Sequence, residues 1–199
     1  AAVPSPAPSG RPAATIATFE PPPRRVPPLP PPARAAARAA APPGRAYRDA
    51  LAQFATGVTV ICARAPEGAL VGFTANSFNS VSLDPPLVVW SLALDASNLA
   101  AFERADGYVI NVLADDQVAL AQRFASPHVD RFTGVDYQLG PAGAPRIAGC
   151  VAWFECRHHS QQRAGDHVLF IGRVDAFARH AGAGLVFHHG RYGTTRPLE

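Results

Sequence analysis

The sequence predicts a mostly β fold, an antiparallel β-barrel with a few short helices. About six or seven runs rich in β-branched and aromatic residues are separated by short loops, and helix-like segments are few. Runs and helices do not alternate in the repeating order that builds a doubly wound parallel sheet. The sequence Gly182-Ala-Gly184 also lacks the third Gly and the following helix of a dinucleotide-binding fingerprint.

The composition is that of a globular chain with room for one hydrophobic core. It has 199 residues, of which 48% are hydrophobic and 17% are charged. All 18 basic residues are Arg, so the chain has neither a Walker A lysine nor a Schiff-base lysine. The net charge of +3 comes from residues 1–44, where five Arg face one acid. The rest of the chain is near neutral, which argues against a nucleic-acid surface.

The three cysteines lie in apolar, strand-like runs: Cys62, Cys150 and Cys156. An odd count is a poor disulfide framework, so a reducing cytoplasm is the expected location. No apolar run approaches the roughly 20 residues that span a bilayer, and no signal peptide is visible, so no membrane partner is expected.

A metal site is not expected either. The pairs His158-His159 and His188-His189 should each point to opposite faces of a strand, so the two rings of a pair cannot easily share one ion. The spacings His-Glu-x-x-His and Cys-x-x-Cys are absent.

Residues 1–44 form a separate, proline-rich segment. They hold 14 of the 21 prolines, which fix the backbone and remove hydrogen-bond donors. A disordered, polyproline-like tail rich in Pro, Ala and Arg is expected, and residues 45–199 should form the folded domain. The tail is either an extension without a role or a basic docking arm, for example an SH3-type ligand.

The folded domain should open with a short amphipathic helix. Tyr47, Leu51 and Phe54 have the i, i+4, i+7 spacing of one apolar helix face, and Gly57 should end the helix.

The strands that follow are apolar runs bounded by turn residues. The run at 87–94 is apolar enough to be buried on both faces. Short helices are expected at 99–104, with Ser97 as N-cap, and at 115–124. Residues 126–145 should be irregular, and a loop should join the last two long strands. The expected strands cover residues 58–62, 69–74, 87–94, 107–113, 149–158, 165–174 and 184–192.

Residues 72–86 are the most informative stretch for function. They hold two clusters of Thr, Asn and Ser between strand-like runs and end in a double proline. These side chains should lie on a strand and its exit loop, where small donors and acceptors can bind the polar edge of a planar ligand. A polar turn that satisfies its own backbone is the alternative explanation.

The order Gly-x-Thr-Ala-Asn-Ser-Phe-x-Ser-Val-Ser-Leu-x-Pro-Pro-Leu, which starts at Gly72, resembles the flavin reductase-like proteins. Further similar pieces follow in the same order, and together they cover residues 45–193: Tyr108-Val-Ile-Asn111-Val-Leu113, Gly165-Asp166-His167 and Phe187-His188-x-Gly190-x-Tyr192. The resemblance implies a split β-barrel, Greek-key-like and antiparallel, that binds FMN and forms a homodimer. It also implies reduction of flavin by NADH or NADPH. In many relatives the reduced flavin passes to a separate flavin-dependent monooxygenase.

With this resemblance, the polar stretch becomes the expected wall for the flavin ring. Ser91 and Leu92 should lie under the ribityl chain. Because there is no Lys, the phosphate needs hydroxyls, Arg or a helix N-terminus, and Ser97 with Asn98 is the expected cradle. Arg123 is expected at the surface. The candidate ring contacts are Thr74, Ala75, Asn76, Ser77, Ser80, Val81 and Ser82.

Four further polar residues are candidates around the flavin. Asn111, inside an apolar run, is either a flavin contact or a buried amide bonded to backbone. His167 matches a family position near the nicotinamide, where its ring could bind the carboxamide or move a proton; a histidine bonded to Asp166 or backbone is the alternative. His188 and Tyr192 could complete the pyridine-nucleotide pocket. Hydride transfer itself asks little acid–base help from the protein, because the cofactor carries the chemistry.

Three functions follow from these observations. The first is an NAD(P)H:FMN oxidoreductase, with FAD as the alternative flavin. The second is a non-catalytic flavin-binding module for electron transfer or sensing. The third is a small barrel used only for interaction, with the tail as its docking arm.

Overall fold

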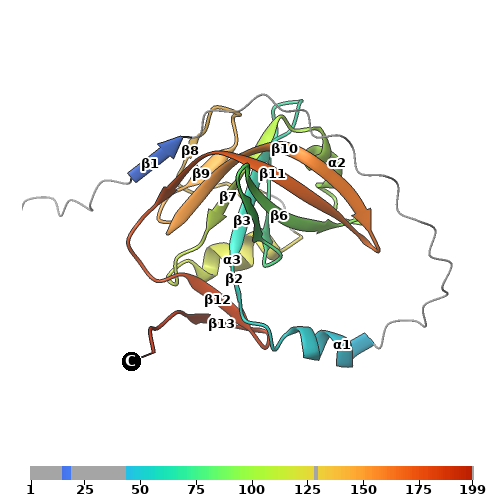
Figure 1. Cartoon of the computed structure of the whole chain (residues 1–199), viewed down its shortest axis with the longest axis vertical. Helices are drawn as coiled ribbons and strands as arrows, with labels where there is room; N and C mark the ends of the chain where they lie inside the picture. The colour runs from blue at the N-terminus through green and yellow to red at the C-terminus, as the bar shows by residue number, and fades with distance from the viewer. Residues whose placement is uncertain (1–14, 19–43, 128–129, 199) are drawn as a thin grey trace, which may run out of the picture.

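The computed structural model describes residues 15–18, 44–127 and 130–198, and these form a mostly β structure with three short helices (Figure 1). The helices are α1 (Gly44–Leu51), α2 (Leu99–Arg104) and α3 (Val118–Ala125). The first strands are β1 (Thr15–Thr18), β2 (Thr56–Gly57), β3 (Thr59–Arg64), β4 (Leu70–Ala75), β5 (Asn79–Leu83), β6 (Pro86–Ala93) and β7 (Gly107–Val112). The later strands are β8 (Tyr137–Leu139), β9 (Pro145–Ile147), β10 (Ala152–Ala164), β11 (His167–Arg179), β12 (Leu185–His188) and β13 (Arg191–Thr194).

The main sheet is antiparallel and curls into a barrel that is not closed by a ladder. Its strand order is β4-β3-β7-β10-β11-β6-β5, and β1 pairs with β11 outside this path. No ladder joins β4 to β6 within the described residues. Instead, the Ser77 hydroxyl just after β4 bonds the main chain of Ser91 on β6. The predicted split β-barrel is confirmed, and the split lies between β4 and β6.

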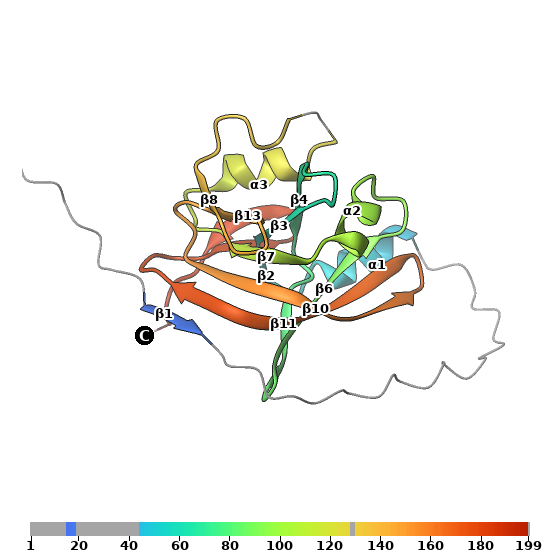
Figure 2. The same ribbon diagram turned by 90° about the horizontal axis from the view of Figure 1, so that it is seen from above.

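Two larger hydrophobic cores lie on the two faces of β3, and a smaller cluster around Val109 covers the outer face of β7. Inside the barrel, Trp90 stacks on Phe170 with ring centroids 4.2 Å apart, and Phe102 and Tyr108 meet Trp90 edge-on. The second core lies between the sheet and α3, where Phe124 packs with β3 (Figure 2). The strands buried on both faces are therefore β3 and β7.

The prediction that residues 87–94 are buried on both faces is wrong. Along β6 only alternate residues are buried, namely Val88, Trp90 and Leu92. The residues between them are partly buried, so one face of β6 packs in the core and the other is only partly covered.

Three irregular regions of the prediction turn out to contain strands. The second half of the polar stretch forms β5, which makes a hairpin with β6 that projects past β10 and β11 (Figure 2). The expected loop at 160–165 is mostly strand, because β10 continues to Ala164. The region 126–145 contains β8 and the start of β9. Part of the tail is also ordered, since Thr15–Thr18 forms β1; residues 1–14 and 19–43 lie outside the described residues.

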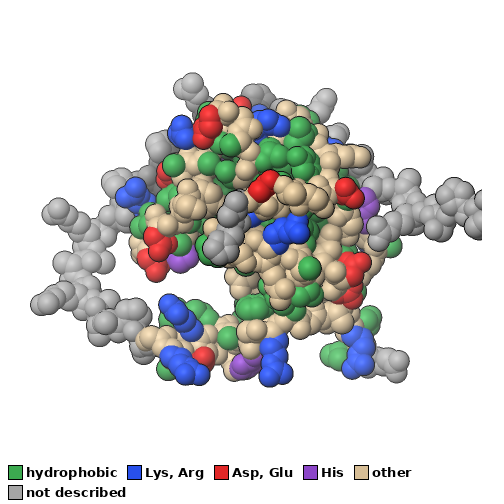
Figure 3. All heavy atoms as spheres, turned by 180° about the vertical axis from the view of Figure 1, so that it is seen from behind, with side chains coloured by type: hydrophobic (Ala, Val, Ile, Leu, Met, Phe, Trp, Pro, Cys, Tyr) green, Lys and Arg blue, Asp and Glu red, His purple; other side chains and the backbone are tan. Residues whose placement is uncertain are grey.

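The expected N-terminal helix is present as α1, but it ends at Leu51 and not at Gly57. The helix projects away from the barrel (Figures 1 and 3), and none of its side chains is buried. Tyr47 and Leu51 on its apolar face are 53% and 56% exposed, and Phe54 just beyond is 72% exposed. No helix within the described part of the chain is long and apolar enough to cross a membrane.

Candidate functional site

The structure brings most of the predicted ring contacts together in one cavity at the split of the barrel, which we call the split pocket. It has a volume of about 260 Å³ and lies where β4 ends beside β6 and the start of β11. His167, the first residue of β11, lines this pocket together with polar residues of β4 and β6. The split pocket is lined by Phe73, Thr74, Ala75, Asn76, Ser77, Ser91, Leu92, Ala93 and His167.

The edge strand β4 offers main-chain groups to this pocket. It is the last strand of the sheet, so only β3 pairs with it. The carbonyl of Gly72 accepts a hydrogen bond from Arg131 Nη1 at 2.6 Å, on the side away from β3. Since alternate residues of a strand present their main-chain groups to the same side, the N–H and C=O of Thr74 also point away from β3. A planar ligand in the split can therefore bond directly to the backbone.

Two hydroxyls near the split have structural partners. Thr74 Oγ1 donates to the carbonyl of Ala121 at 2.6 Å, which ties β4 to α3. Ser77 Oγ accepts from the N–H of Ser91 at 3.0 Å and lies 3.2 Å from its carbonyl. Both oxygens keep further acceptor capacity. Ser77 in addition fixes the width of the split, a role that the sequence did not indicate.

The ring of His167 is hydrogen-bonded to the side chain of the preceding residue, Asp166. Its Nδ1 lies 2.7 Å from Asp166 Oδ1, and the ring is 44% exposed. This hydrogen bond holds the pKa of Asp166 below its ordinary value. A carboxylate on Nδ1 fixes the tautomer with the proton on Nδ1, so Nε2 of the neutral ring is left as an acceptor. The Asp166 bond that was the alternative explanation is thus present, and the ring still lines the pocket.

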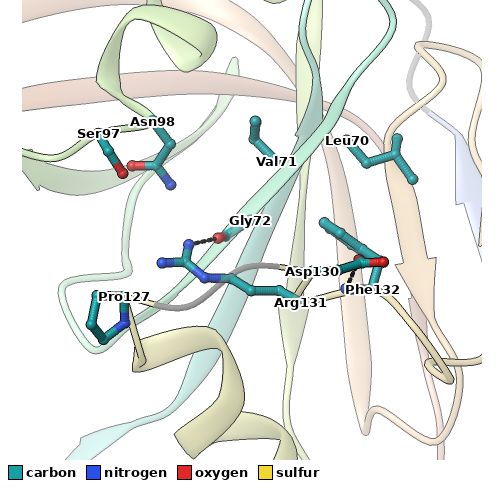
Figure 4. Close-up of a pocket in the computed structure, with 9 residues that line it drawn as sticks. All are labelled: Leu70, Val71, Gly72, Ser97, Asn98, Pro127, Asp130, Arg131 and Phe132. Atoms are coloured by element: carbon teal, nitrogen blue, oxygen red, sulfur yellow. Dashed lines mark hydrogen bonds between the residues drawn. The ribbon is translucent and has the colours of Figure 1, made fainter.

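A second cavity, which we call the Arg131 pocket, lies further along β4 (Figure 4). It has a volume of about 220 Å³. The Arg131 side chain crosses it and also donates to the carbonyl of Ser126. Its lining residues are Leu70, Val71, Gly72, Ser97, Asn98, Pro127, Asp130, Arg131 and Phe132.

Asn98 carries an unsatisfied polar group in the Arg131 pocket. Its Nδ2 is buried and has no hydrogen-bond partner in the described chain, and its amide points across the pocket towards Arg131 (Figure 4). The N-cap of α2 is Asn98 and not the predicted Ser97, and no side chain caps the helix. A buried unpaired amide costs about 1–3 kcal/mol, so a ligand that accepts its hydrogen bond is strongly favoured.

The two pockets lie one after the other along the free edge of β4. The Arg131 pocket uses residues 70–72 of β4, and the split pocket uses residues 73–75 and the turn that follows. Three residues of strand span roughly 10 Å. Gly72 lies at the junction, where a Cβ would come within 2.8 Å of the Phe124 ring, so Gly lets α3 pack close to this edge.

Asn111 is not part of either pocket, and its assignment as a flavin contact is corrected. The side chain is 0% exposed. Its Nδ2 donates to the carbonyls of Val60 and Pro145 at 3.1 and 3.2 Å, and its Oδ1 accepts from the N–H of Ile147 at 2.8 Å. The amide is a structural link between β3, β7 and β9.

Other predicted contacts lie elsewhere in the described chain. Ser80, Val81 and Ser82 lie on β5, in the projecting hairpin, and do not line the split pocket. His188 and Tyr192 lie in the separate sheet β13-β12-β2, outside both pockets.

The His158-His159 pair is arranged differently from the prediction. A register shift in β10 leaves His159 without a partner on β11, so both rings line the same surface cavity. Burial lowers the pKa of His158. Within the described residues, no group of three or more His, Cys, Asp or Glu side chains could hold a metal ion.

Residues 51–196 match the family described as flavin reductase like domain. The chain belongs to this family. The match spans most of the described chain, including every residue that lines the two pockets.

Curated relatives in this family carry matching names. "FMN reductase (NADH) SmoA" of Agrobacterium fabrum is 44% identical over 149 residues, which are 75% of this chain and 84% of that protein. "Stachydrine N-demethylase reductase subunit Stc3" of Rhizobium meliloti is 46% identical over 74% of this chain and 64% of that protein. A Rhizobium meliloti protein named "Probable flavin reductase" is 47% identical over 76% of this chain. The chain spans about half of that protein, 49% of its length.

Solved structures of the family share the fold. The NADH:FAD oxidoreductase SgcE6 of Streptomyces globisporus, in complex with NAD and FAD fragments, superimposes with a TM-score of 0.72 at 39% identity. The superposition covers 76% of this chain and 92% of that one.

Proposed function

We propose that this chain is an NAD(P)H-dependent flavin reductase that prefers FMN and supplies reduced flavin to a partner monooxygenase. Relatives named as an NADH-dependent FMN reductase and as a demethylase reductase subunit support this activity. The observation that best supports this function is the pair of pockets along β4. The split pocket is polar, and the Arg131 pocket contains a cationic side chain. When bound, the flavin supplies the redox chemistry and accepts a hydride from the nicotinamide.

The split pocket suits the polar edge of the flavin ring. The outward N–H and C=O of Thr74 offer a donor and an acceptor on the side away from β3. The main chain of Ala75 faces β3, where its carbonyl accepts from Thr59 Oγ1. Asn76, which is exposed at the end of β4, adds an amide that can match either kind of partner. Ser91 and Leu92 form the opposite wall.

The Arg131 pocket suits the phosphate. Arg131 brings a full positive charge, Ser97 a hydroxyl, and Asn98 a buried amide N–H that lacks a partner. Charge-assisted hydrogen bonds of this kind are the strongest that a side chain offers to a phosphate. The residues present therefore fit FMN, even though the chain has no Lys.

His167 is the residue we assign to the nicotinamide side of the split pocket. Its Nε2 is the acceptor left by the Asp166 bond, and it can bind a carboxamide N–H or hold a proton beside the ring. Asp166 keeps this orientation, so it is a positioning residue.

The test of the activity is direct. The purified chain should oxidise NADH or NADPH only when FMN, FAD or riboflavin is added, and fastest with FMN. Flavin binding without turnover would instead support the non-catalytic flavin module, and the absence of both would contradict the proposal.

Replacing Asn76 by Leu tests the assigned ring edge. Loss of one polar contact should raise the Kd for FMN about 10-fold, because about 1.4 kcal/mol corresponds to a factor of ten. The Kd can be measured by quenching of flavin fluorescence. Asn79→Leu, on the exposed start of β5, is the matched control and should leave the Kd unchanged; equal effects of both changes would remove Asn76 from the site.

We also propose that the chain forms a homodimer. Exposed apolar side chains lie on two projecting segments: Leu51 at the end of α1 with Phe54 just beyond it, and Val81 with Leu83, which is 91% exposed, on the hairpin. We expect both the α1 segment and the hairpin to pack onto a second copy of the chain, because exposed apolar patches mark association surfaces.

Charge at the exposed apolar positions should break this dimer. Leu51→Glu combined with Leu83→Glu should sediment as a monomer at concentrations where the unmodified chain is a dimer. Ala50→Glu with Asp84→Asn is a control that changes neighbouring positions and leaves Leu51, Phe54, Val81 and Leu83 in place. A monomeric unmodified chain would contradict the dimer.

We place the protein in the cytoplasm. All three cysteines are free and buried, which is typical of a reducing compartment.

A further inference from the structure

The side chain of Arg131 is held in place by main-chain carbonyls. Its Nε and Nη2 donate to the carbonyl of Ser126 at 3.1 and 2.8 Å, and its Nη1 donates to the carbonyl of Gly72 at 2.6 Å. A guanidinium has five N–H donors, so two of them, one on each terminal nitrogen, have no acceptor in the described chain. None of the ion pairs within the described residues involves Arg131. Arg131 therefore presents a fixed positive charge and two N–H groups to an anion.

Asn98 adds donors to the same pocket. Its amide points across the pocket towards the guanidinium of Arg131 (Figure 4), and its buried Nδ2 lacks an acceptor within the described residues. Ser97, the preceding residue, contributes a hydroxyl to the lining. The pocket thus gathers N–H and O–H donors around one positive charge, an arrangement that suits an anion with several terminal oxygens.

The one acid among the described lining residues, Asp130, is bonded to its own turn. Its carboxylate accepts from the hydroxyl and the N–H of Thr133 and from the N–H of Phe132. The Thr133 hydroxyl, followed by the N–H of Phe132, holds the pKa of Asp130 below its ordinary value, and Arg123 on α3 acts in the same direction. Asp130 stays ionised and both arginines stay charged from about pH 5 to pH 8, so the charge of the pocket is constant over this range.

We infer that the Arg131 pocket selects a phosphomonoester dianion over a phosphodiester, and that Asn98 and the unpaired N–H groups of Arg131 set a preference for FMN over FAD. A phosphomonoester has three terminal oxygens and close to two negative charges at pH 7. Each phosphate of FAD is bonded to a further group, so it has two terminal oxygens and one charge, and leaves part of the donor set without an acceptor. The inference rests on the proposed function, because it takes the flavin ring to lie in the split pocket.

Selection of the dianion gives FMN binding a pH dependence that FAD binding lacks. The second pKa of a phosphomonoester is about 6. The contribution of the dianion is complete above this pH and is lost as the pH falls through it. At about pH 5 roughly a tenth of free FMN is dianionic, so the Kd for FMN should rise about 10-fold between about pH 7.5 and pH 5. The phosphates of FAD bind no proton in this range.

Calorimetric titration of the unmodified chain with FMN, FAD and riboflavin at both pH values tests this dependence. At the higher pH, FMN should bind about 10-fold more tightly than FAD or better, because one lost charge-assisted hydrogen bond corresponds to that factor. At the lower pH most of this advantage should disappear. His167 lines the split pocket and meets the ring of all three flavins, so an effect of its charge would appear with riboflavin as well.

Asn98→Asp tests the donor set directly. The change replaces the amide N–H groups by a negative charge and hardly alters the shape. Asn98 is the N-cap of α2, where Asp is a preferred residue, so the fold should be retained. The variant should lose the preference for FMN and keep the Kd for riboflavin. Asn79→Asp, on the exposed start of β5, is the matched control and should keep both the preference and its pH dependence.

Three results would overturn the inference and leave the reductase activity standing. They are equal Kd values for FMN and FAD in the unmodified chain, a preference for FMN that does not change with pH, and a preference that survives in Asn98→Asp. Binding of none of the three flavins would contradict the proposed function, and this inference with it.

Discussion

Replacement of Asn111 by Leu is expected to lower the free energy of unfolding by about 3 kcal/mol or more. The change removes three hydrogen bonds and leaves the carbonyl of Pro145 and the N–H of Ile147 buried without their partner. Each such group costs about 1–3 kcal/mol. For a chain of this size the midpoint of thermal unfolding should fall by roughly 6–12 °C. Thermal unfolding followed by circular dichroism measures the effect.

Asn98→Leu is the matched control for this prediction. It also replaces an amide by a similar volume, but the Nδ2 of Asn98 has no partner to lose. Stability should therefore stay the same or rise, while the Kd for FMN should increase. In Asn111→Leu the folded fraction should keep its Kd. A stable Asn111→Leu variant with weakened flavin binding would show that Asn111 contacts the flavin after all.

Arg131→Met is expected to weaken FMN binding by about 10- to 150-fold. Among the described residues, Arg131 is the one Arg that lines the Arg131 pocket, and a hydrogen bond to a charged group is worth about 1.5–3 kcal/mol. Riboflavin, which has no phosphate, should bind the variant and the unmodified chain equally well. A titration of both flavins against both proteins isolates the phosphate contribution.

Arg123→Met is the control for charge alone. Arg123 lies on α3, donates to the carbonyl of Thr133 and lines a different cavity. It should change the Kd for FMN little. If Arg123→Met and Arg131→Met weaken FMN binding equally, or if Arg131→Met weakens riboflavin as much as FMN, the Arg131 pocket does not hold the phosphate.

Local sequence patterns predicted the strands of the barrel well, because alternation and β-branched runs report burial directly. They failed where neighbours decide the structure. Ser80 and Ser82 have the residue types of a loop, yet they form β5 because β6 pairs with them. Burial of 87–94 on both faces was inferred from an apolar run, whereas only alternate residues of β6 are buried and the others are partly covered.

For the candidate site too, local sequence motifs predicted some residues correctly and failed where the surrounding fold decides. The motif from Gly72 predicted the residues from Thr74 to Ser77, which do line one pocket with His167. Arg131, which we propose for the phosphate, was missed because it lies in a segment with few periodic signals. Without Lys, the sequence left hydroxyls, an Arg or a helix N-terminus for that role. Asn111 was open to two interpretations because a sequence does not show which partners surround a buried amide.

Hydrogen exchange of the full chain with and without FMN tests the central claim, that the flavin lies along β4 from the split pocket to the Arg131 pocket. FMN should slow exchange at residues 73–77, 97–98 and 131–132. It should leave the amides of β5 and of residues 188–192 unchanged when oligomeric state is held constant. Protection of 188–192 without protection of 73–77 would place the flavin elsewhere and contradict this site.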